Sequence, residues 1–523
     1  MPPKLSAAFK WGWTAFILLL TVFPYLWAYA TTPAGFHYSW TLPPYPEDSF
    51  AYMAWSRQAL NGHWLFSLKY TALPHAPFLF HPFFLVCGKL AAWTGWEIGV
   101  VHLLMKSLGV ALFFWTLFKV LEHLRFDRIQ AACACVLVGL SSGLGALARD
   151  LVGPETLGNL LPIDLWLVDS NTFWCLLWNP LYPVTLALIL GAFLFVDRAS
   201  LGGKSRDFYL GGLAIGVLGL IHPYETAVLW PLMILIIVVR LGRQAWPALL
   251  RFAAASAPIL AYAAAVALFH PLLREHSVHS QEKMHSPSLA ACLIGFGLPL
   301  ALALWGAFRY RREIASRYWP LLAWLALGFG LSRLPLWFQM KLLFGLHLPL
   351  CLLAGAACGL IWRQTSWRTT ILLSGILLAF MTTFSLWTDA VREHPERPYR
   401  IGSDVMEGLA FLQKDSRTDD IVCASPATSL LIPVYAGNTV IWGHWAQSAG
   451  FTARQQWAHR VFDDASPLNA QERSREFWGM GIKYVFLDGA WREKFGIHPP
   501  EWLSARAQKA FENPAVIIYR RLL

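Results

Sequence analysis

Residues 12–30 read GWTAFILLLTVFPYLWAYA, and residues 31–48 continue as TTPAGFHYSWTLPPYPED. The first segment is long and apolar enough to cross a bilayer as a helix. The second is a loop that ends in Pro46-Glu47-Asp48, which places two adjacent carboxylates a short distance after a membrane span. Such a pair can cap a helix, bind a cation or remove a proton from an attacking hydroxyl group. The rest of the chain bears on which of these roles applies.

The composition is that of a polytopic membrane protein. Of 523 residues, 56% are hydrophobic and only 14% are charged, and the mean hydropathy is +0.45. The 27 tryptophans suit membrane interfaces, where this side chain is enriched. The net charge of +11 does not require a nucleic-acid partner, and we expect none, because cytoplasmic loops of membrane proteins carry an excess of Lys and Arg.

Basic residues predict the topology. They cluster at Lys4/Lys10, Lys119/Arg125/Arg128, Arg198/Lys204/Arg206, Arg240/Arg243/Arg251, Arg309/Arg311/Arg312/Arg317 and Arg363/Arg368. If every cluster is cytoplasmic, consecutive clusters must be separated by an even number of spans. About eleven spans satisfy this rule, near 12–30, 98–118, 129–148, 173–196, 208–222, 226–240, 252–270, 289–308, 318–334, 342–362 and 369–388. We therefore expect a multi-pass protein of the cytoplasmic (inner) membrane, with its amino terminus inside and its carboxyl-terminal domain outside.

One apolar stretch, residues 77–93, must not cross the membrane, since a crossing there would invert every later loop. It is predicted to lie in the outer interface, with a re-entrant helix as the alternative. The eight cysteines show neither a disulfide framework nor the spacing of metal ligands.

Two domains are predicted. Residues 1–390 form the transmembrane domain, with a long first outer loop at 31–97, and residues 391–523 have the composition of a water-soluble domain. Helical patterning at 403–414 and 469–480 alternates with short apolar runs at 421–424, 439–442, 484–487 and 515–519. This pattern is typical of a small α/β domain. The fold class is thus a mainly α membrane protein with an extracytoplasmic α/β domain.

Ionisable residues gather in the loops predicted to lie outside. Besides Glu47 and Asp48, these loops hold Asp150, Glu155, Asp164, Asp169, His222, Glu225, Arg333 and Lys341, as well as the charged and histidine-rich segment 271–287. Charges near hydrocarbon are costly and tend to mark function.

The chain resembles a known class of enzymes. A first span, an outer loop with the pattern Glu47-Asp48-x3-Tyr52-x9-Gly62, about eleven spans and an α/β tail resemble the C-type (GT-C) integral-membrane glycosyltransferases, which use sugars carried on polyprenyl phosphates. Several stretches resemble a bacterial branch of that class, namely His222-Pro-Tyr-Glu225, residues 338–349 (FQMKLLFGLHLP), Gly443-His444 and residues 481–486 (GIKYVF). Where paired basic residues are expected after Gln339, this chain has Met340-Lys341, which leaves one cation.

The resemblance assigns the acceptor-activating carboxylate to the first outer loop. Asp48 is the preferred general base, with Glu47 beside it, because Asp48 fits the Asp-x3-Tyr pattern, and Tyr52 would lie one turn further along the same helix face. The alternative is that Pro46, Glu47 and Asp48 only start a helix, as acids in a first turn favour the helix dipole.

The other candidates are substrate-binding residues. Glu155, Asp164, His222 and Glu225 are expected to contact the sugar or a cation, and Arg333 and Lys341 the lipid phosphate. Further substrate-binding candidates are Tyr52, Tyr224 and Gln339. For His222 to Glu225 the alternative is a turn between spans, and for Arg333 and Lys341 it is snorkelling at the interface. No cofactor is required by the sequence; a divalent cation held by carboxylates of two loops is an option.

These observations favour an inverting glycosyltransferase, a hexosyl- or pentosyltransferase. It would move a sugar from a polyprenyl-phosphate donor to a lipid, glycan or protein acceptor at the outer face of the membrane. The alternatives are a membrane transporter and a non-catalytic glycan- or lipid-binding membrane protein.

Overall fold

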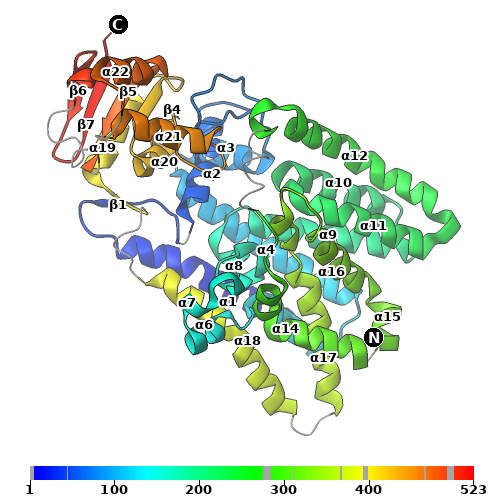
Figure 1. Cartoon of the computed structure of the whole chain (residues 1–523). Coiled ribbons are helices and arrows are strands. Elements are labelled where there is room, and N and C mark those ends of the chain that lie inside the picture. The colour runs from blue at the N-terminus through cyan, green and yellow to red at the C-terminus, as the bar shows by residue number, and fades with distance from the viewer. Residues whose placement is uncertain are drawn as a thin grey trace. The chain divides into compact units, whose positions relative to one another are not determined.

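The computed structural model describes residues 5–43, 45–274, 284–309, 311–364, 368–392, 399–463, 467–489, 491 and 500–522. These residues form two compact units (Figure 1). The helical unit comprises residues 1–24, 103–267 and 278–392. The mixed unit comprises residues 25–102, 268–277 and 393–523, so that the first outer loop joins the carboxyl-terminal segment in one compact body. Most of the histidine-rich segment 271–287 lies outside the described residues.

Helices of different lengths, most of them apolar, build the helical unit. They are α1 (Ala7–Ala30), α4 (Ile98–His123), α5 (Arg128–Leu140), α6 (Gly145–Val152), α8 (Thr172–Trp178), α9 (Tyr182–Ser200), α10 (Arg206–Ile221), α11 (Thr226–Leu241), α12 (Ala245–Phe269), α14 (Leu289–Arg309), α15 (Arg311–Arg317), α16 (Trp319–Leu331), α17 (His347–Gln364) and α18 (Arg368–Val391). Each of the eleven predicted spans overlaps at least one of them. Within the described residues, six helices are long and apolar enough to cross a membrane, or seven if α5 and α6 form one bent span, so a multi-pass protein is supported at a coarser count than eleven.

Two predicted spans are broken. α5 and α6 meet at an angle of 53° across Ser141-Ser142-Gly143. A side chain at Gly143 would lie 2.2 Å from the carbonyl oxygen of Gly295 in α14, so only glycine allows this close approach. α14 is itself kinked at Gly297, where φ is +42°. The chain therefore departs from regular helical geometry where the backbones near Gly143 and in α14 approach each other closely.

Polar contacts inside the bundle satisfy backbone carbonyls at other helix irregularities. Pro24 has no N–H group and so leaves the Leu20 carbonyl without its helical donor, and the indole of Trp387 donates to that carbonyl at 2.8 Å. The buried Nζ atom of Lys106 donates to the carbonyl oxygens of Thr21, at 2.6 Å, and of Leu177, at 3.0 Å, near the end of α8.

The mixed unit begins with the strand β1 (Phe36–Tyr38), which pairs antiparallel with β2 (Arg400–Gly402). Helix α2 (Pro46–Leu60) packs against α3 (Pro82–Thr94), where a side chain at Gly88 would lie 2.2 Å from the Ser56 carbonyl oxygen. α3 has 13 residues, about 20 Å, and is too short to cross the roughly 30 Å hydrocarbon core. This length agrees with a segment that does not cross.

The carboxyl-terminal part of the mixed unit holds a five-stranded sheet in the order β4-β3-β5-β7-β6. Its strands are β3 (Ile421–Ala424), β4 (Thr439–Val440), β5 (Ile482–Leu487), β6 (Ala507–Glu512) and β7 (Ile517–Arg521). Strand β3 runs parallel to both of its neighbours, β4 and β5. Strand β7 runs antiparallel to both of its neighbours, β5 and β6. Helices α19 (Ser403–Asp415), α20 (Pro426–Tyr435), α21 (Phe451–Phe462) and α22 (Ala470–Gly479) accompany the strands (Figure 1).

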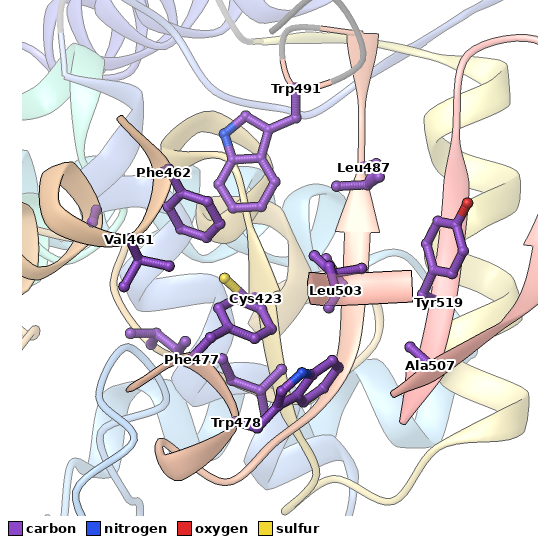
Figure 2. Packing of buried hydrophobic residues seen from close by; sticks show 14 of the residues in the cluster. Cys423, Val461, Phe462, Phe477, Trp478, Leu487, Trp491, Leu503, Ala507 and Tyr519 are labelled. Carbon is purple, nitrogen blue, oxygen red and sulfur yellow. The ribbon is translucent and has the colours of Figure 1, made fainter. Parts of the chain in front are cut away.

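An aromatic core supports this sheet. Phe462, Phe477, Trp478 and Trp491 pack with aliphatic residues of the strands, and Figure 2 shows these rings around Cys423 and Leu503. The four predicted apolar runs coincide with β3, β4, β5 and β7, and the two predicted helices with α19 and α22. The strand β6 and the helices α20 and α21 were not predicted.

Candidate active site

The carboxylate pair stands at the start of α2. Pro46 occupies the first helical position, where its missing N–H costs nothing, and Glu47 and Asp48 follow in the first turn. Tyr45, the N-cap residue of this helix, makes no side-chain capping hydrogen bond. Glu47 and Asp48 therefore fill a helix-start role, since acids in a first turn favour the helix dipole.

Asp48 contacts a histidine from the carboxyl-terminal segment. The Nε2 atom of His444 lies 2.6 Å from Oδ1 of Asp48, across 396 residues of sequence. Nδ1 of His444 accepts a hydrogen bond from the backbone N–H of Ala446 at 3.1 Å. Because Nδ1 is an acceptor, the ring proton of the neutral imidazole is on Nε2, and His444 donates to Asp48. This geometry orients the carboxylate and favours its ionised form.

The loop that carries His444 is held firmly. A side chain at Gly443 would lie 2.5 Å from the ring of Tyr70, so glycine is required for this close approach. The Tyr70 hydroxyl donates to the Leu430 carbonyl at 3.0 Å, and Ser448 donates to the His444 carbonyl at 2.8 Å. The side chain of His444 is 5% exposed and that of Asp48 is 33% exposed. The pair thus combines a buried donor with a carboxylate that solvent can reach.

The two acids of the pair differ. Burial raises the pKa of the Glu47 carboxyl, and the neighbouring charge of Asp48 raises it further. Asp48, with its imidazole donor, is the one set up to remain a carboxylate. Tyr52 stacks on Phe84 of α3, with ring centroids 4.8 Å apart, and so helps to join α2 to α3.

A second set of polar residues lies inside the helical unit. Nζ of Lys341, in the short helix η6 (Gln339–Leu343), lies 2.8 Å from Oδ2 of the buried Asp169. His222 and Glu225 form another buried pair, with Nδ1 and Oε2 2.6 Å apart. Among the described residues, no hydrogen-bond partner is found for the buried Oε1 atom of Glu225. These pairs bring together four of the ionisable residues that the sequence placed in outer loops.

Aromatic rings frame the His222–Glu225 pair. Tyr182 packs edge-on against the His222 ring at 5.4 Å, and Phe344 lies 5.0 Å from it. Tyr224 packs against Trp337 and Phe338, at 5.9 and 5.5 Å. Residues 222–225 and 337–344 therefore pack together, although more than a hundred residues separate them.

Arg333 and Gln339 bind backbone rather than each other. The Arg333 guanidinium donates to the Pro287 carbonyl at 2.5 Å and lies over the ring of Phe329. Gln339 accepts from the backbone N–H of Ser286 at 2.8 Å and donates to the Leu334 carbonyl at 2.7 Å. Both side chains hold the segment at 286–287 in place, and Arg333 itself is exposed.

The remaining predicted residues are separate. Asp164 is fully buried and accepts from the backbone N–H of Gly145 at 3.1 Å, at the start of α6. Burial raises its pKa to about 7. Glu155 is exposed in the short helix α7 (Pro154–Leu157). Asp164 thus serves the broken helix, and no contact brings Glu155 to the other candidates in the described part of the chain.

Metal-binding potential is limited in what the structure describes. Within the described ranges, no group of three or more His, Cys, Asp or Glu side chains has the geometry to hold a metal ion. Asp169, for example, is a single carboxylate that pairs with a basic side chain, Lys341.

Sequence reasoning missed His444 as a site residue. The dipeptide Gly443-His444 stood among the stretches that carry the resemblance, but nothing local links it to Asp48. The usable signal was the combination of a glycine and a histidine directly after an apolar run, at the end of a predicted strand. Chemistry-bearing residues often follow strands in α/β domains.

Comparison with known proteins relates the fold to membrane glycosyltransferases. The oligosaccharyltransferase of Archaeoglobus fulgidus in its apo form is similar over 99% of this chain and 75% of its own, with 13% identity and a TM-score of 0.55. The arabinofuranosyltransferase AftD from Mycobacteria, as the mutant R1389S, is similar over 99% of this chain and 42% of its own, with 16% identity and a TM-score of 0.56. The archaeal oligosaccharyltransferase AglB in complex with an inhibitory peptide and a dolichol-phosphate gives 12% identity and a TM-score of 0.51, over 99% of this chain and 75% of its own.

No protein-family model matches the sequence, and no curated protein is detectably similar to it in sequence. The relationship is therefore one of structure. The chain has the fold of the GT-C class of membrane glycosyltransferases, and the resemblance drawn from its sequence is confirmed at this level.

Proposed function

We propose that this protein is an inverting glycosyltransferase that uses a polyprenyl-phosphate sugar as donor. The observation that carries the proposal is the contact between Asp48 and His444 in a chain with the GT-C fold. A partly exposed carboxylate, held by a neutral imidazole donor at a helix start, has the properties of a general base. A residue that only started a helix would need no such partner.

The chemistry assigns Asp48 one step. The acceptor hydroxyl oxygen attacks the anomeric carbon of the donor sugar, and the bond from that carbon to the phosphate oxygen breaks. The hydroxyl proton passes to Oδ2 of Asp48, the oxygen that does not accept from His444. The polyprenyl phosphate leaves with the bonding electrons. Attack opposite the leaving group inverts the anomeric configuration, and phosphate is a good enough leaving group to need no strong acid.

For the donor, we propose a lipid-linked sugar of the polyprenyl type. The presence of dolichol-phosphate in the AglB complex supports this choice for a protein of the same fold. Arg333 and Lys341 are the candidate cations for the phosphate, with Gln339 and the His222–Glu225 pair as candidate contacts to the sugar. Lys341 already pairs with Asp169, so it would share its donors between Asp169 and the phosphate. A divalent cation bound with the donor is part of the same proposal.

The membrane orientation follows from the basic clusters. We propose that the amino terminus is cytoplasmic and that the mixed unit faces the outside of the cytoplasmic membrane, where transfer would occur. The acceptor is a lipid, glycan or protein on that face. Hexosyl and pentosyl transfer both remain within the proposal.

The test compares Asp48→Asn with Glu47→Gln in the purified protein, using a polyprenyl-phosphate sugar and a hydroxyl-bearing acceptor extract. Asn keeps the shape and capping ability of Asp but cannot accept the proton. We expect Asp48→Asn to fold normally and to lose roughly 10²–10⁴-fold in transfer rate, the usual contribution of a positioned base. Glu47→Gln is the matched control and should lose much less. Normal turnover by Asp48→Asn would leave only the helix-start role.

A further inference from the structure

A cavity of about 260 Å³ lies in the mixed unit, beside the loop that carries His444. Its lining includes Trp442, Gly443, Phe451, Gln455, His459 and Trp491. All of these residues come from the carboxyl-terminal segment, and Gly443 immediately precedes the histidine that contacts Asp48. The cavity lining is therefore adjacent in sequence to the histidine that contacts the candidate base.

The aromatic walls are fixed in orientation. The indole of Trp442 donates to the Ala424 carbonyl at 3.2 Å, which sets the plane of the ring. Trp491 packs against Phe462, with centroids 4.9 Å apart, and its backbone N–H donates to the Asp488 carboxylate at 3.1 Å. Figure 2 shows the rings of Trp491 and Phe462 next to each other. Both indoles are more than nine-tenths buried, so the cavity is preformed.

Two polar side chains stand on one face of α21. Gln455 and His459 are four residues apart, which places them one above the other on the helix, and both are exposed. His459 also lies 3.6 Å from the carboxylate of Asp463. Among the described residues that line the cavity, none is Asp, Glu, Lys or Arg. These described lining residues offer a phosphate or carboxylate ligand no Lys or Arg partner.

We infer that this cavity binds a neutral saccharide unit of the acceptor, an inference that rests on the proposed function. The C–H face of a sugar ring packs on indole and phenyl rings, and its hydroxyl groups need a few amide or imidazole partners at the rim. The described lining of the cavity offers that combination and includes no Asp, Glu, Lys or Arg. A sugar bound there would belong to the same glycan chain as the hydroxyl group that Asp48 deprotonates. The acceptor class is thus a neutral glycan rather than a protein.

The experiment measures binding, not transfer. Full-length protein in lipid nanodiscs is applied to immobilised linear arabinan, galactan, mannan and glucan oligosaccharides, with acidic oligogalacturonate as the charged comparison. We expect at least one neutral series to bind. Gln455→Ala should weaken that binding by roughly 2–10-fold, as expected for one lost neutral hydrogen bond. Trp491→Leu should weaken it more, since it removes a stacking surface.

The adjacent Gln456 supplies the matched control, because it is the same residue type on the same helix, is exposed and does not line the cavity. Gln456→Ala should bind as the parent protein does. Equal losses in Gln455→Ala and Gln456→Ala, binding of oligogalacturonate alone, or no binding to any neutral series would each overturn the inference. The inference would also be overturned if decanoate displaced the bound glycan equally well from the parent protein and from Gln455→Ala. That result would indicate a pocket for an acyl chain.

Asp48→Asn separates this inference from the proposed function. We expect that variant to lose transfer and to keep its affinity for the neutral oligosaccharide. Suppose instead that transfer depends on Asp48, but Gln455→Ala and Trp491→Leu bind the glycan as the parent protein does. This result would overturn the cavity assignment and leave the glycosyltransferase proposal intact. Glycan binding that depends on Gln455, with no transfer in the parent protein, would support the cavity and count against the enzyme.

Discussion

His444 donates from Nε2 to Oδ1 of Asp48 over 2.6 Å, although 396 residues separate the two in the sequence. The contact joins the predicted first outer loop to the carboxyl-terminal segment within one compact unit. A hydrogen bond to a charged acceptor is worth more than one between neutral groups, about 1.5–3 kcal/mol. The orientation of the Asp48 carboxylate therefore depends on a segment that comes well after α18, the last helix of the helical unit, in the sequence.

Loss of this contact should be measurable in two ways. We expect His444→Ala to lower transfer by roughly 10–100-fold, which corresponds to the ~1.5–3 kcal/mol of the lost hydrogen bond. The acidic limb of the pH–rate profile should also move to higher pH, because the donor that favours the ionised carboxylate is gone. His63→Ala, at an exposed histidine of the same unit, is the control. A lower rate with an unmoved acidic limb would indicate a structural role for His444 alone.

The Lys341–Asp169 pair offers a test that separates folding from donor binding. Lys341→Met should destabilise the protein by about 3–5 kcal/mol, because it leaves the buried Asp169 carboxylate without its partner. The double variant Asp169→Asn/Lys341→Met should recover thermal stability. If Lys341 also binds the donor phosphate, this stable double variant still binds the polyprenyl-phosphate donor roughly 10–100-fold more weakly. Recovery of donor affinity along with stability would assign the pair to structure only.

Much of the fold could be predicted from hydropathy and from the positions of basic residues. Apolar segments of the right length gave helices at each predicted span, because burial in hydrocarbon depends on composition more than on detail. The breaks could not be predicted in this way. The bend at Ser141–Gly143 depends on the approach of Gly295 from α14, and that contact is set by tertiary packing. Within the described residues, length and apolarity support six or seven spans, so the count of about eleven derived from hydropathy and charge stays a prediction.

Only part of the candidate site could be predicted from the sequence. Asp48 stood out because two adjacent acids followed a span. His444 did not, because its role depends on a loop fixed by Tyr70 and Gly443, far away in the chain. The burial of Asp164 and its hydrogen bond from the backbone N–H of Gly145 could not be predicted either, and its role in substrate binding stays a prediction. β6 escaped prediction because its sequence, AQKAFE, alternates poorly and forms an edge strand.

Asp164 should make stability depend on pH. Burial raises its pKa from 3.8 to about 7, so between these values the folded protein holds a proton that the unfolded chain has released. The contribution of Asp164 to stability therefore falls as pH rises from about 4 to about 7, and levels off above that value. Asp164→Asn keeps an acceptor for Gly145 and does not titrate, so the thermal midpoint of this variant should be less sensitive to pH across that window. An equally steep pH dependence in both proteins would contradict this assignment.

The orientation of the mixed unit can be tested with two matched serine-to-cysteine variants. Ser504 lies exposed in the carboxyl-terminal segment, and Ser205 lies exposed beside the basic cluster between α9 and α10. In intact spheroplasts, a membrane-impermeant maleimide should label Ser504→Cys and leave Ser205→Cys unlabelled, because basic loops are retained in the cytoplasm. After detergent permeabilisation both should react. All native cysteines except the partly exposed Cys133 are buried, so the parent protein gives a low background that can be subtracted. The reverse pattern, with Ser205→Cys labelled in intact spheroplasts and Ser504→Cys protected, would put Asp48 and His444 on the cytoplasmic side and remove the basis for transfer at the outer face.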